Sequence, residues 1–218
     1  MKIIPLLVVL LGTSLSVCAQ QNPQLYNIPT PFERYSHYQI IARGGAAIPM
    51  GPFATGYIDK STLENYSIAV DWILQKPFSV GLELGHTFFS KRIPRATYNI
   101  DGQDISAVQT RTIKLMPLQG VVNLYLGTTN ARIRPYLQLA AGGSLVDYTL
   151  YYGSLGNQQQ SLKFSYGAGV GSKFLFKKDG SIGADIRVKY NQTALNFDYI
   201  ENGVGQLNAT AGLFYRWW

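Results

Sequence analysis

Apolar and polar residues alternate along this chain with a period of two, and this alternation constrains the fold more than any other feature. In residues 66–75 the even positions carry large apolar side chains, whereas the odd positions include Ser67, Asp71 and Gln75. Successive side chains of a β-strand point to opposite faces, so the pattern predicts a strand between two different environments. The composition agrees, because 15 tyrosines, 10 phenylalanines and 22 glycines favour strands and tight turns over helices.

The same alternation predicts eight strands, each long enough to cross a bilayer when tilted, which takes roughly 9–11 residues. They span residues 38–48, 65–75, 78–89, 110–126, 133–148, 161–176, 181–192 and 206–217. In the fourth strand Ile113 and Leu115 have one phase and Leu118 the other. A β-bulge near Met116 and Pro117 would restore a single phase.

Short and long connections alternate between these strands. The short ones are 76–77, 127–132 and 177–180, and the long ones are 49–64, 90–109, 149–160 and 193–205. Short turns at one rim and long loops at the other are typical of outer-membrane barrels. We therefore predict an all-β fold, an eight-stranded antiparallel up-and-down transmembrane β-barrel with both termini on the periplasmic side.

Charged residues fall almost entirely on one face of the predicted strands. The charged face carries Arg43, Asp71, Glu83, Lys114, Lys173, Asp185, Arg187 and Lys189. Lysine or arginine on a lipid-facing surface costs roughly 2–4 kcal/mol at the bilayer midplane, which explains a nearly uncharged outer face. We therefore expect the charges inside the barrel, whose lumen eight strands make narrow enough for side chains to fill.

Charges in a narrow lumen are costly unless they are paired, which predicts a salt-bridged cluster. Its expected members are Arg43, Asp71, Glu83, Lys173, Asp185 and Arg187. We expect Arg43 to reach Asp71 or Glu83, and Lys173 or Arg187 to reach Asp185. The cluster would serve as a structural plug or, alternatively, as a gate on an ion path.

The amino terminus has the three regions of a secretory signal peptide: Lys2, an apolar stretch, and small residues before a cleavage site after Ala19. We predict a signal peptide at 1–19, an extended periplasmic segment at 20–37 and a barrel domain at 38–218. Cys18 is the one cysteine, which excludes a disulfide framework within the chain. Lipidation of Cys18, as in a bacterial lipoprotein, is an open alternative.

At its carboxyl end the chain reads Leu-Phe-Tyr-Arg-Trp-Trp. With the eight alternating segments, this end resembles the small outer-membrane β-barrel family of Gram-negative bacteria, of the outer-membrane protein A type. The resemblance implies that Leu213, Tyr215, Trp217 and Trp218 form the signal read by the barrel-assembly machinery. It also implies an integral outer-membrane monomer in contact with membrane lipid and lipopolysaccharide, and an exported protein seldom meets nucleic acid.

Few residues point to catalysis. His86 lies on the apolar row, where the similar lipid A deacylases place a catalytic histidine, but the position of their serine holds Phe88. The chain has two histidines, His37 and His86, far apart in the sequence, and its one cysteine lies in the predicted leader, so we expect no metal site. The glycines at 167, 169 and 171 lack the spacing of a nucleotide loop and predict an inward row that leaves room for a bulky side chain. We expect no enzyme activity and no cofactor.

The predicted function is a structural, anchoring or surface-interaction role without catalysis. The alternatives are a narrow passive channel, a lipid A-modifying barrel enzyme, and a barrel subunit of a secretion apparatus. Two predicted loops favour a surface role. Lys91, Arg92 and Arg95 could meet lipopolysaccharide phosphates or an acidic partner, and residues 149–160 could form an adhesive tip.

Overall fold

A computed structural model describes residues 38–74, 77–100, 103–126, 131–152, 155–177, 180–195 and 203–217; the side chains of 98–100, 103–105 and 155–156 are not described. The predicted signal peptide (1–19) and extended segment (20–37) lie outside these residues. The described strands are β1 (Tyr38–Met50), β2 (Thr62–Ile73), β3 (Phe78–Ile100), β4 (Gln103–Tyr125), β5 (Ile133–Tyr152), β6 (Leu155–Leu175), β7 (Ile182–Thr193) and β8 (Val204–Trp217). A short helix, α3 (Pro52–Gly56), lies between β1 and β2.

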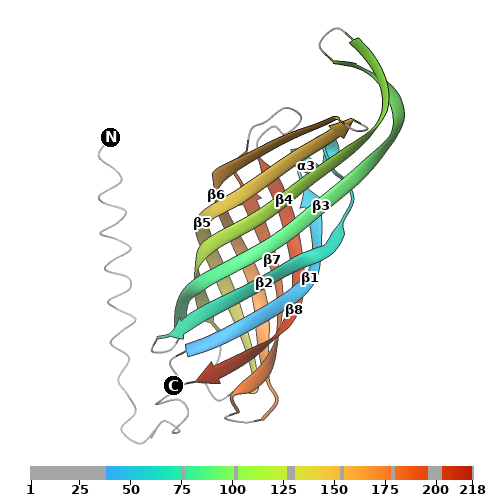
Figure 1. Cartoon of the computed structure of the whole chain (residues 1–218). Helices are drawn as coiled ribbons and strands as arrows, with labels where there is room; N and C mark the ends of the chain where they lie inside the picture. The colour runs from blue at the N-terminus through green and yellow to red at the C-terminus, as the bar shows by residue number, and fades with distance from the viewer. Residues whose placement is uncertain are drawn as a thin grey trace, which may run out of the picture. The chain divides into compact units, whose positions relative to one another are not determined.

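The strands form a closed antiparallel barrel in which each strand pairs with its neighbours in sequence and β8 pairs with β1 (Figure 1). Closure pairs Tyr38 with Trp217 and runs without a register shift to Met50 and Gly205. The predicted fold, an eight-stranded antiparallel up-and-down β-barrel, is confirmed. We call the rim with the β2–β3, β4–β5 and β6–β7 connections the turn end, and the opposite rim the loop end.

Two predicted loops are largely strands. The expected loop at 90–109 is mostly the continuation of β3 and β4, which pair as far as Ile100 and Gln103. The expected loop at 149–160 likewise contains paired residues of β5 and β6. β3 pairs with β2 only as far as Thr87, so the β3–β4 hairpin continues beyond the barrel wall as a two-stranded ribbon (Figure 1).

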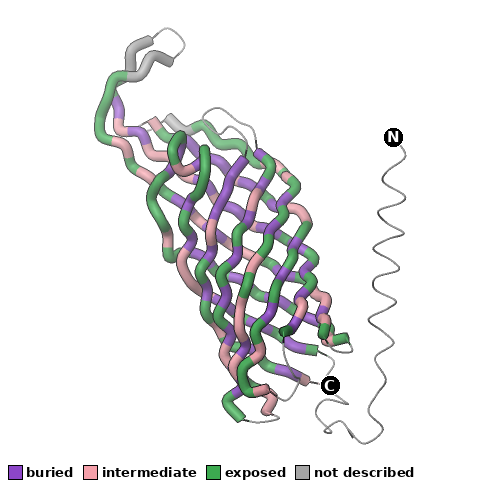
Figure 2. The backbone as a smooth tube through the Cα atoms, turned by 180° about the vertical axis from the view of Figure 1, so that it is seen from behind, coloured by how far each residue is buried: buried purple, intermediate pink, exposed green. Residues whose placement is uncertain are grey.

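Burial alternates along the strands in the sense opposite to that of a water-soluble barrel. Buried and exposed residues alternate along the strands of the barrel (Figure 2). On β2 the buried residues are Asn65, Ser67, Ala69 and Asp71, whereas the intervening residues are exposed. The exposed row carries Tyr66, Ile68, Val70 and Trp72, each 45% or more exposed. The polar row therefore faces the lumen and the apolar row faces outward.

The predicted bulge at Met116 and Pro117 is wrong, because the pairing of β4 with β5 keeps one register from Gln109 to Tyr125. Ile113 and Leu115 instead point into the lumen and are buried, whereas Leu118 points outward and is 56% exposed. The apparent change of phase marks a change of the lumen contents from polar to apolar along β4. For the same reason Lys114 lies on the outward row and not on the charged face.

Candidate functional site

The most distinctive feature of the barrel is a group of buried ionisable side chains inside it, which we call the lumen cluster. Its members come from β1, β2, β3, β6 and β7, each from an inward position of the two-residue alternation. They are Arg43, Asp71, Glu83, Lys173, Asp185, Arg187 and Lys189, all 5% exposed or less.

Glu83 is the centre of the lumen cluster. Its carboxylate forms ion pairs with Arg187 Nη1 and with Lys189 Nζ, the latter at 3.0 Å. Arg43 Nη1 lies 3.5 Å from the same carboxylate. Three cations from two strands therefore converge on one buried carboxylate.

Asp185 and Asp71 hold the remaining contacts of the cluster. Arg43 Nε donates to Asp185 Oδ2 at 2.5 Å, and the Tyr136 hydroxyl donates to Asp185 Oδ1 at 3.0 Å. Gln39 Nε2 donates to Asp71 Oδ2 at 2.7 Å. Each carboxylate therefore has both a charged and a neutral neighbour, since Lys173 Nζ lies 3.7 Å from Asp71.

Lys173 lies in an aromatic cage near the turn end. Its ammonium nitrogen donates to the Tyr125 hydroxyl at 2.7 Å. The same nitrogen is 5.0, 5.3 and 5.7 Å from the ring centroids of Tyr125, Tyr136 and Phe214. Cation–π attraction is strongest where water is excluded, so these rings compensate part of the lost hydration of the ammonium group.

Neutral amides complete the network. Gln138 Oε1 accepts from Arg187 Nη1 at 2.9 Å, and Gln119 Oε1 accepts from Lys189 Nζ at 2.8 Å. Asn123 Nδ2 donates to Asp71 Oδ2 at 3.1 Å. These amides reach from β4 and β5 to charged side chains on β2 and β7, none of them on a neighbouring strand, so the side chains extend into the lumen and fill it.

The structure brings all six residues of the expected cluster into this network, but with different partners for two of them. We expected Lys173 or Arg187 to reach Asp185, whereas Arg43 pairs with Asp185 and Lys173 lies beside Asp71. Lys173 and Asp185 do stand opposite each other on β6 and β7. Long side chains in a curved sheet converge on the barrel axis, so the partners come from distant strands.

Sequence reasoning missed Lys189 and the amides as members of the cluster. Lys189 follows Asp185 and Arg187 at intervals of two on β7, so its inward direction was readable from the alternation. Its contact with Glu83 was not, because 106 positions separate them along the chain.

The inward glycine row on β6 has the expected role of leaving room for bulky groups. A Cβ on Gly171 would lie 2.5 Å from the Tyr136 Cζ, and a Cβ on Gly169 would lie 3.0 Å from the Lys189 Cβ. The absence of these side chains lets Tyr136 and Lys189 enter the network.

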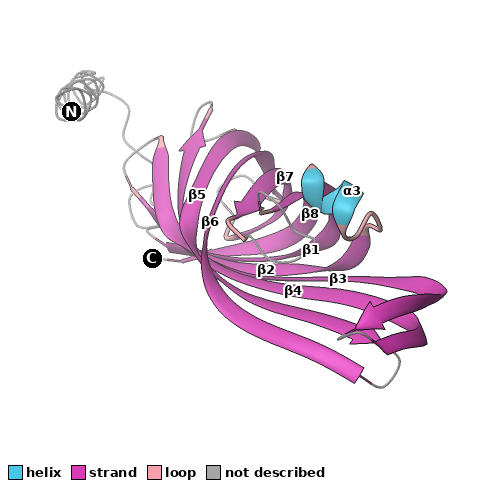
Figure 3. Cartoon of the chain, turned by 90° about the horizontal axis from the view of Figure 1, so that it is seen from above, coloured by secondary structure: helices cyan, strands magenta, loops and turns pink. Residues whose placement is uncertain are grey.

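An apolar plug fills the loop end of the lumen. Its buried members are Ala47, Phe53, Tyr57, Ile58, Phe89, Ile113, Leu115, Val146, Tyr148, Leu150, Leu195 and Val204. Helix α3 supplies Phe53 and lies at the mouth of the ring beside β1 and β8 (Figure 3). Tyr57 stacks on Tyr148 with ring centroids 5.2 Å apart. Arg111 Nη1 donates to the Gly56 carbonyl at 3.1 Å and so fastens the end of the helix.

His86 lies on the outward row beside Tyr66, with ring centroids 6.4 Å apart. Its Nδ1 is buried and has no hydrogen-bond partner. A general base needs a partner that orients its ring, and Nδ1 lacks one. Among the described residues, no group of three or more His, Cys, Asp or Glu side chains could hold a metal ion.

The carboxyl-terminal residues that we expect to form the assembly signal lie on β8. Leu213 and Tyr215 are exposed on the outer face at 58% and 49%, and Trp217 stacks on Tyr215 and on Tyr38. Trp218 lies outside the described residues.

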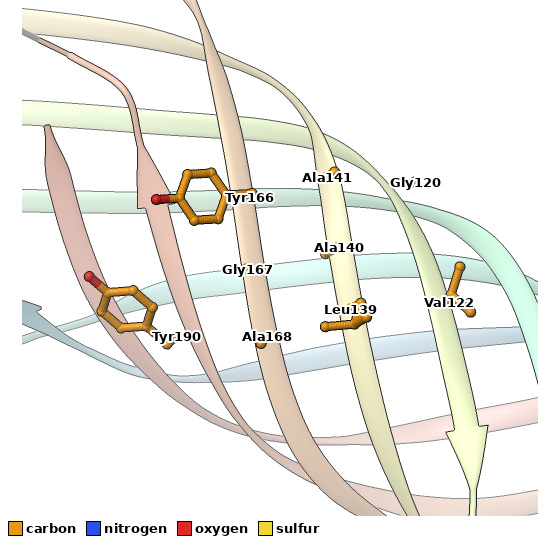
Figure 4. A pocket seen from close by; sticks show the side chains of 9 residues that line it. All are labelled: Gly120, Val122, Leu139, Ala140, Ala141, Tyr166, Gly167, Ala168 and Tyr190. Atoms are coloured by element: carbon orange, nitrogen blue, oxygen red, sulfur yellow. The ribbon is translucent and has the colours of Figure 1, made fainter. Parts of the chain in front are cut away.

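A groove of about 400 Å³ crosses the outer face over β4 to β7 (Figure 4). It is lined by Gly120, Val122, Leu139, Ala140, Ala141, Tyr166, Gly167, Ala168 and Tyr190. Since Leu139, Tyr166 and Tyr190 are exposed, the groove belongs to the outer face of the barrel and not to its lumen.

No family model matches the chain, and no curated protein sequence matches it. Solved structures match its fold. Neisserial surface protein A is similar at 12% identity and a TM-score of 0.51, over 83% of this chain and 96% of that one. Ail, the attachment invasion locus protein of Yersinia pestis, is similar at 14% identity and a TM-score of 0.46, over 84% of this chain and 97% of that one. The outer membrane protein W of E. coli is similar at 16% identity and a TM-score of 0.38, over 84% of this chain and 98% of that one.

The likeness to Neisserial surface protein A concerns the fold. Together with the closed ring of eight antiparallel strands, it confirms that the chain has the fold of the small outer-membrane β-barrels. In the part of the chain that the structure describes, no helix is long and apolar enough to cross a membrane.

Proposed function

We propose that this chain is an integral outer-membrane β-barrel with a closed lumen, and that it acts through the hairpins at its loop end. The observation that carries the proposal is the inverted burial. Ile68, Leu82, Leu139, Leu162 and Leu213 are between 54% and 70% exposed, while seven ionisable side chains are buried inside. Soluble monomers rarely expose contiguous apolar patches larger than a few hundred Å², whereas a bilayer requires an apolar exterior.

The bacterial outer membrane is the proposed location, with both ends of the chain in the periplasm. The connections at the turn end are short, and the β3–β4 and β5–β6 hairpins at the loop end are long. This asymmetry is typical of outer-membrane barrels, in which turns face the periplasm and longer elements face outward. The predicted signal peptide and the aromatic carboxyl end support export and recognition by the barrel-assembly machinery.

A structural or surface role is favoured over a passive channel because two separate barriers fill the lumen. The lumen cluster crosses the barrel with paired charges, and the apolar plug closes the loop end. A hydrated ion would have to displace both. A catalytic role has less support, since Nδ1 of His86 has no hydrogen-bond partner.

The β3–β4 ribbon is the proposed interaction element. Arg92, Arg95 and Thr97 are exposed on it, whereas Lys91 is paired with Asp59 at 2.9 Å. The exposed arginines suit lipopolysaccharide phosphates, because a guanidinium group binds phosphate oxygens through two parallel hydrogen bonds. We propose that the protein is a monomer and that outer-membrane lipid and lipopolysaccharide surround it.

Cysteine labelling of intact cells tests this placement. Thr97→Cys places a thiol on the ribbon, and Lys177→Cys places one at the turn end. Both residues are exposed. A membrane-impermeant maleimide is expected to label Thr97→Cys in intact cells and Lys177→Cys only after the outer membrane is permeabilised. Labelling of both sites, or of Lys177→Cys alone, in intact cells would contradict the proposal.

A further inference from the structure

The charges of the lumen cluster do not balance. Its cations are Arg43, Lys173, Arg187 and Lys189, and its anions are Asp71, Glu83 and Asp185. Four positive groups therefore face three carboxylates among the described residues of the cluster. An uncompensated charge away from water is strongly unfavourable, so an anionic partner would stabilise the excess cation.

Two donors of the cluster show where this partner is missing. Arg187 Nε is buried without a hydrogen-bond partner. Arg43 Nη1 is also buried without one, since its approach to Glu83 at 3.5 Å forms no hydrogen bond. Buried donors of native proteins are almost always satisfied, and charged donors most of all. Both unused groups belong to arginines that form an ion pair with the same oxygen of Glu83, Oε2.

The surrounding neutral groups cannot supply the missing charge. Lys189 Nζ donates to Gln119 Oε1 at 2.8 Å, and Arg187 Nη1 donates to Gln138 Oε1 at 2.9 Å. An amide oxygen accepts a hydrogen bond but brings no negative charge. The lumen cluster therefore has neutral acceptors for Lys189 and Arg187 but one carboxylate fewer than it has cations.

We propose that the lumen cluster binds one small monovalent anion of the chloride class, held by Arg187 Nε and Arg43 Nη1 and balancing Lys189. This site goes beyond the proposed surface role, because it assigns a ligand to the interior. Its function is to complete the charge balance of the closed lumen.

Urea unfolding of the detergent-solubilised mature protein tests the site, since guanidinium chloride would itself supply the anion. Sodium chloride is exchanged for sodium gluconate at constant ionic strength, so that screening does not change. Above the dissociation constant, each tenfold rise in chloride is expected to raise the folding equilibrium constant about tenfold. An equilibrium constant that is the same in chloride and in gluconate would overturn the proposal.

Two variants separate the site from general salt effects. Lys189→Met removes the excess cation, and Gln119→Glu supplies an internal carboxylate beside Lys189. Both are expected to abolish the dependence on chloride, and Gln119→Glu should also be more stable than the unmodified protein in gluconate. Lys177→Met, at an exposed turn residue, should retain the full dependence. If Lys189→Met does not fold, Gln119→Glu carries the test, and a chloride dependence that it leaves unchanged contradicts the site.

Crystals grown in bromide give a direct check. An anomalous peak within hydrogen-bond distance of Arg187 Nε or Arg43 Nη1 would support the site. A peak only at the protein surface, or a water molecule at these donors with no anomalous signal, would overturn it.

Discussion

Glu83 on β3 and Lys189 on β7 meet inside the barrel with 3.0 Å between carboxylate oxygen and ammonium nitrogen, although 106 positions separate them along the chain. The same carboxylate also pairs with Arg187. One acidic residue on β3 thus holds two basic residues on β7, and separation of these strands would break both ion pairs.

Replacement of Glu83 by glutamine is expected to destabilise the barrel strongly. The change leaves Arg43, Arg187 and Lys189 close together without their shared carboxylate, and loss of one partner from a buried pair costs about 3–5 kcal/mol. Urea titration of tryptophan fluorescence in lipid or detergent measures this loss. Glu64→Gln on the exposed part of β2 is the control and should change stability by less than about 0.5 kcal/mol. Equal effects of the two changes would contradict the proposed importance of Glu83.

Truncation of Phe53 in α3 is expected to weaken the apolar plug without opening the lumen. Phe53 is fully buried and packs edge to face on Phe89, with ring centroids 5.7 Å apart. Phenylalanine-to-alanine changes in cores cost about 3–5 kcal/mol. Planar-bilayer recordings of Phe53→Ala should remain silent, because the lumen cluster still crosses the barrel. Sustained conductance in this variant would show that the plug alone closes the lumen.

Alanine at position 171 is expected to disturb the hydrogen bond between Tyr136 and Asp185. The added Cβ would lie 2.5 Å from the Tyr136 Cζ and 2.7 Å from the Ile186 carbonyl oxygen, so the ring must move. Overpacking of this kind costs about 1–3 kcal/mol. Gly44→Ala is the matched control, since its Cβ would meet Tyr66 at an ordinary 3.6 Å. Thermal unfolding of the two variants should therefore differ clearly.

The Asp59–Lys91 pair at the loop end predicts that folding stability depends on pH. A hydrogen bond from Lys91 lowers the pKa of the Asp59 carboxyl below its ordinary value. A carboxyl group whose pKa is lowered on folding adds stability above its unfolded pKa and loses this contribution as the pH falls through its folded pKa. NMR titration should therefore find a lower Asp59 pKa in the unmodified protein than in Lys91→Met. The same pKa in both proteins would mean that the pair does not form in solution.

The lipid-facing assignment predicts a cost that depends on depth. Arginine in place of Leu139, which lies in the middle of β5 and is 66% exposed, should destabilise the barrel in vesicles by roughly 2–4 kcal/mol. Arginine in place of Leu162, nearer the loop end and 70% exposed, should cost about 0–1 kcal/mol. Refolding equilibria in vesicles measure both. Two small and equal effects would be the result for a face in contact with water.

Much of this barrel could be predicted from the sequence because its walls separate two different surroundings. The rule that neighbours point to opposite faces placed Arg43, Glu83 and Asp185 on one side of the wall, and the structure places them in the lumen. The rule also holds on β4, where Ile113 faces inward and Leu118 outward, but both residues are apolar and their polarity wrongly predicted a bulge. Alternation of polarity carries no information where both faces are apolar.

Other features depend on contacts between strands that are distant in the sequence. The extension of β3 and β4 into a ribbon rests on backbone pairing through Thr97 and Ser106, which needs no alternation of side chains. The partner of Asp185 depends on which side chains cross the lumen, and Arg43 reaches it from a position 142 residues away. Neither relationship follows from local spacing.

Spin labels at two adjacent residues of β5 test most directly whether the apolar face meets lipid. Leu139 is exposed on the outer face, whereas Ala140 faces the lumen and is only 6% exposed. The one cysteine, Cys18, lies in the predicted leader, so the mature chain accepts single labels at Leu139→Cys and Ala140→Cys. In lipid vesicles, the label at 139 should collide readily with dissolved oxygen and rarely with a water-soluble nickel complex, while the label at 140 should be shielded from both. Greater access of the nickel complex than of oxygen at 139 would contradict the account.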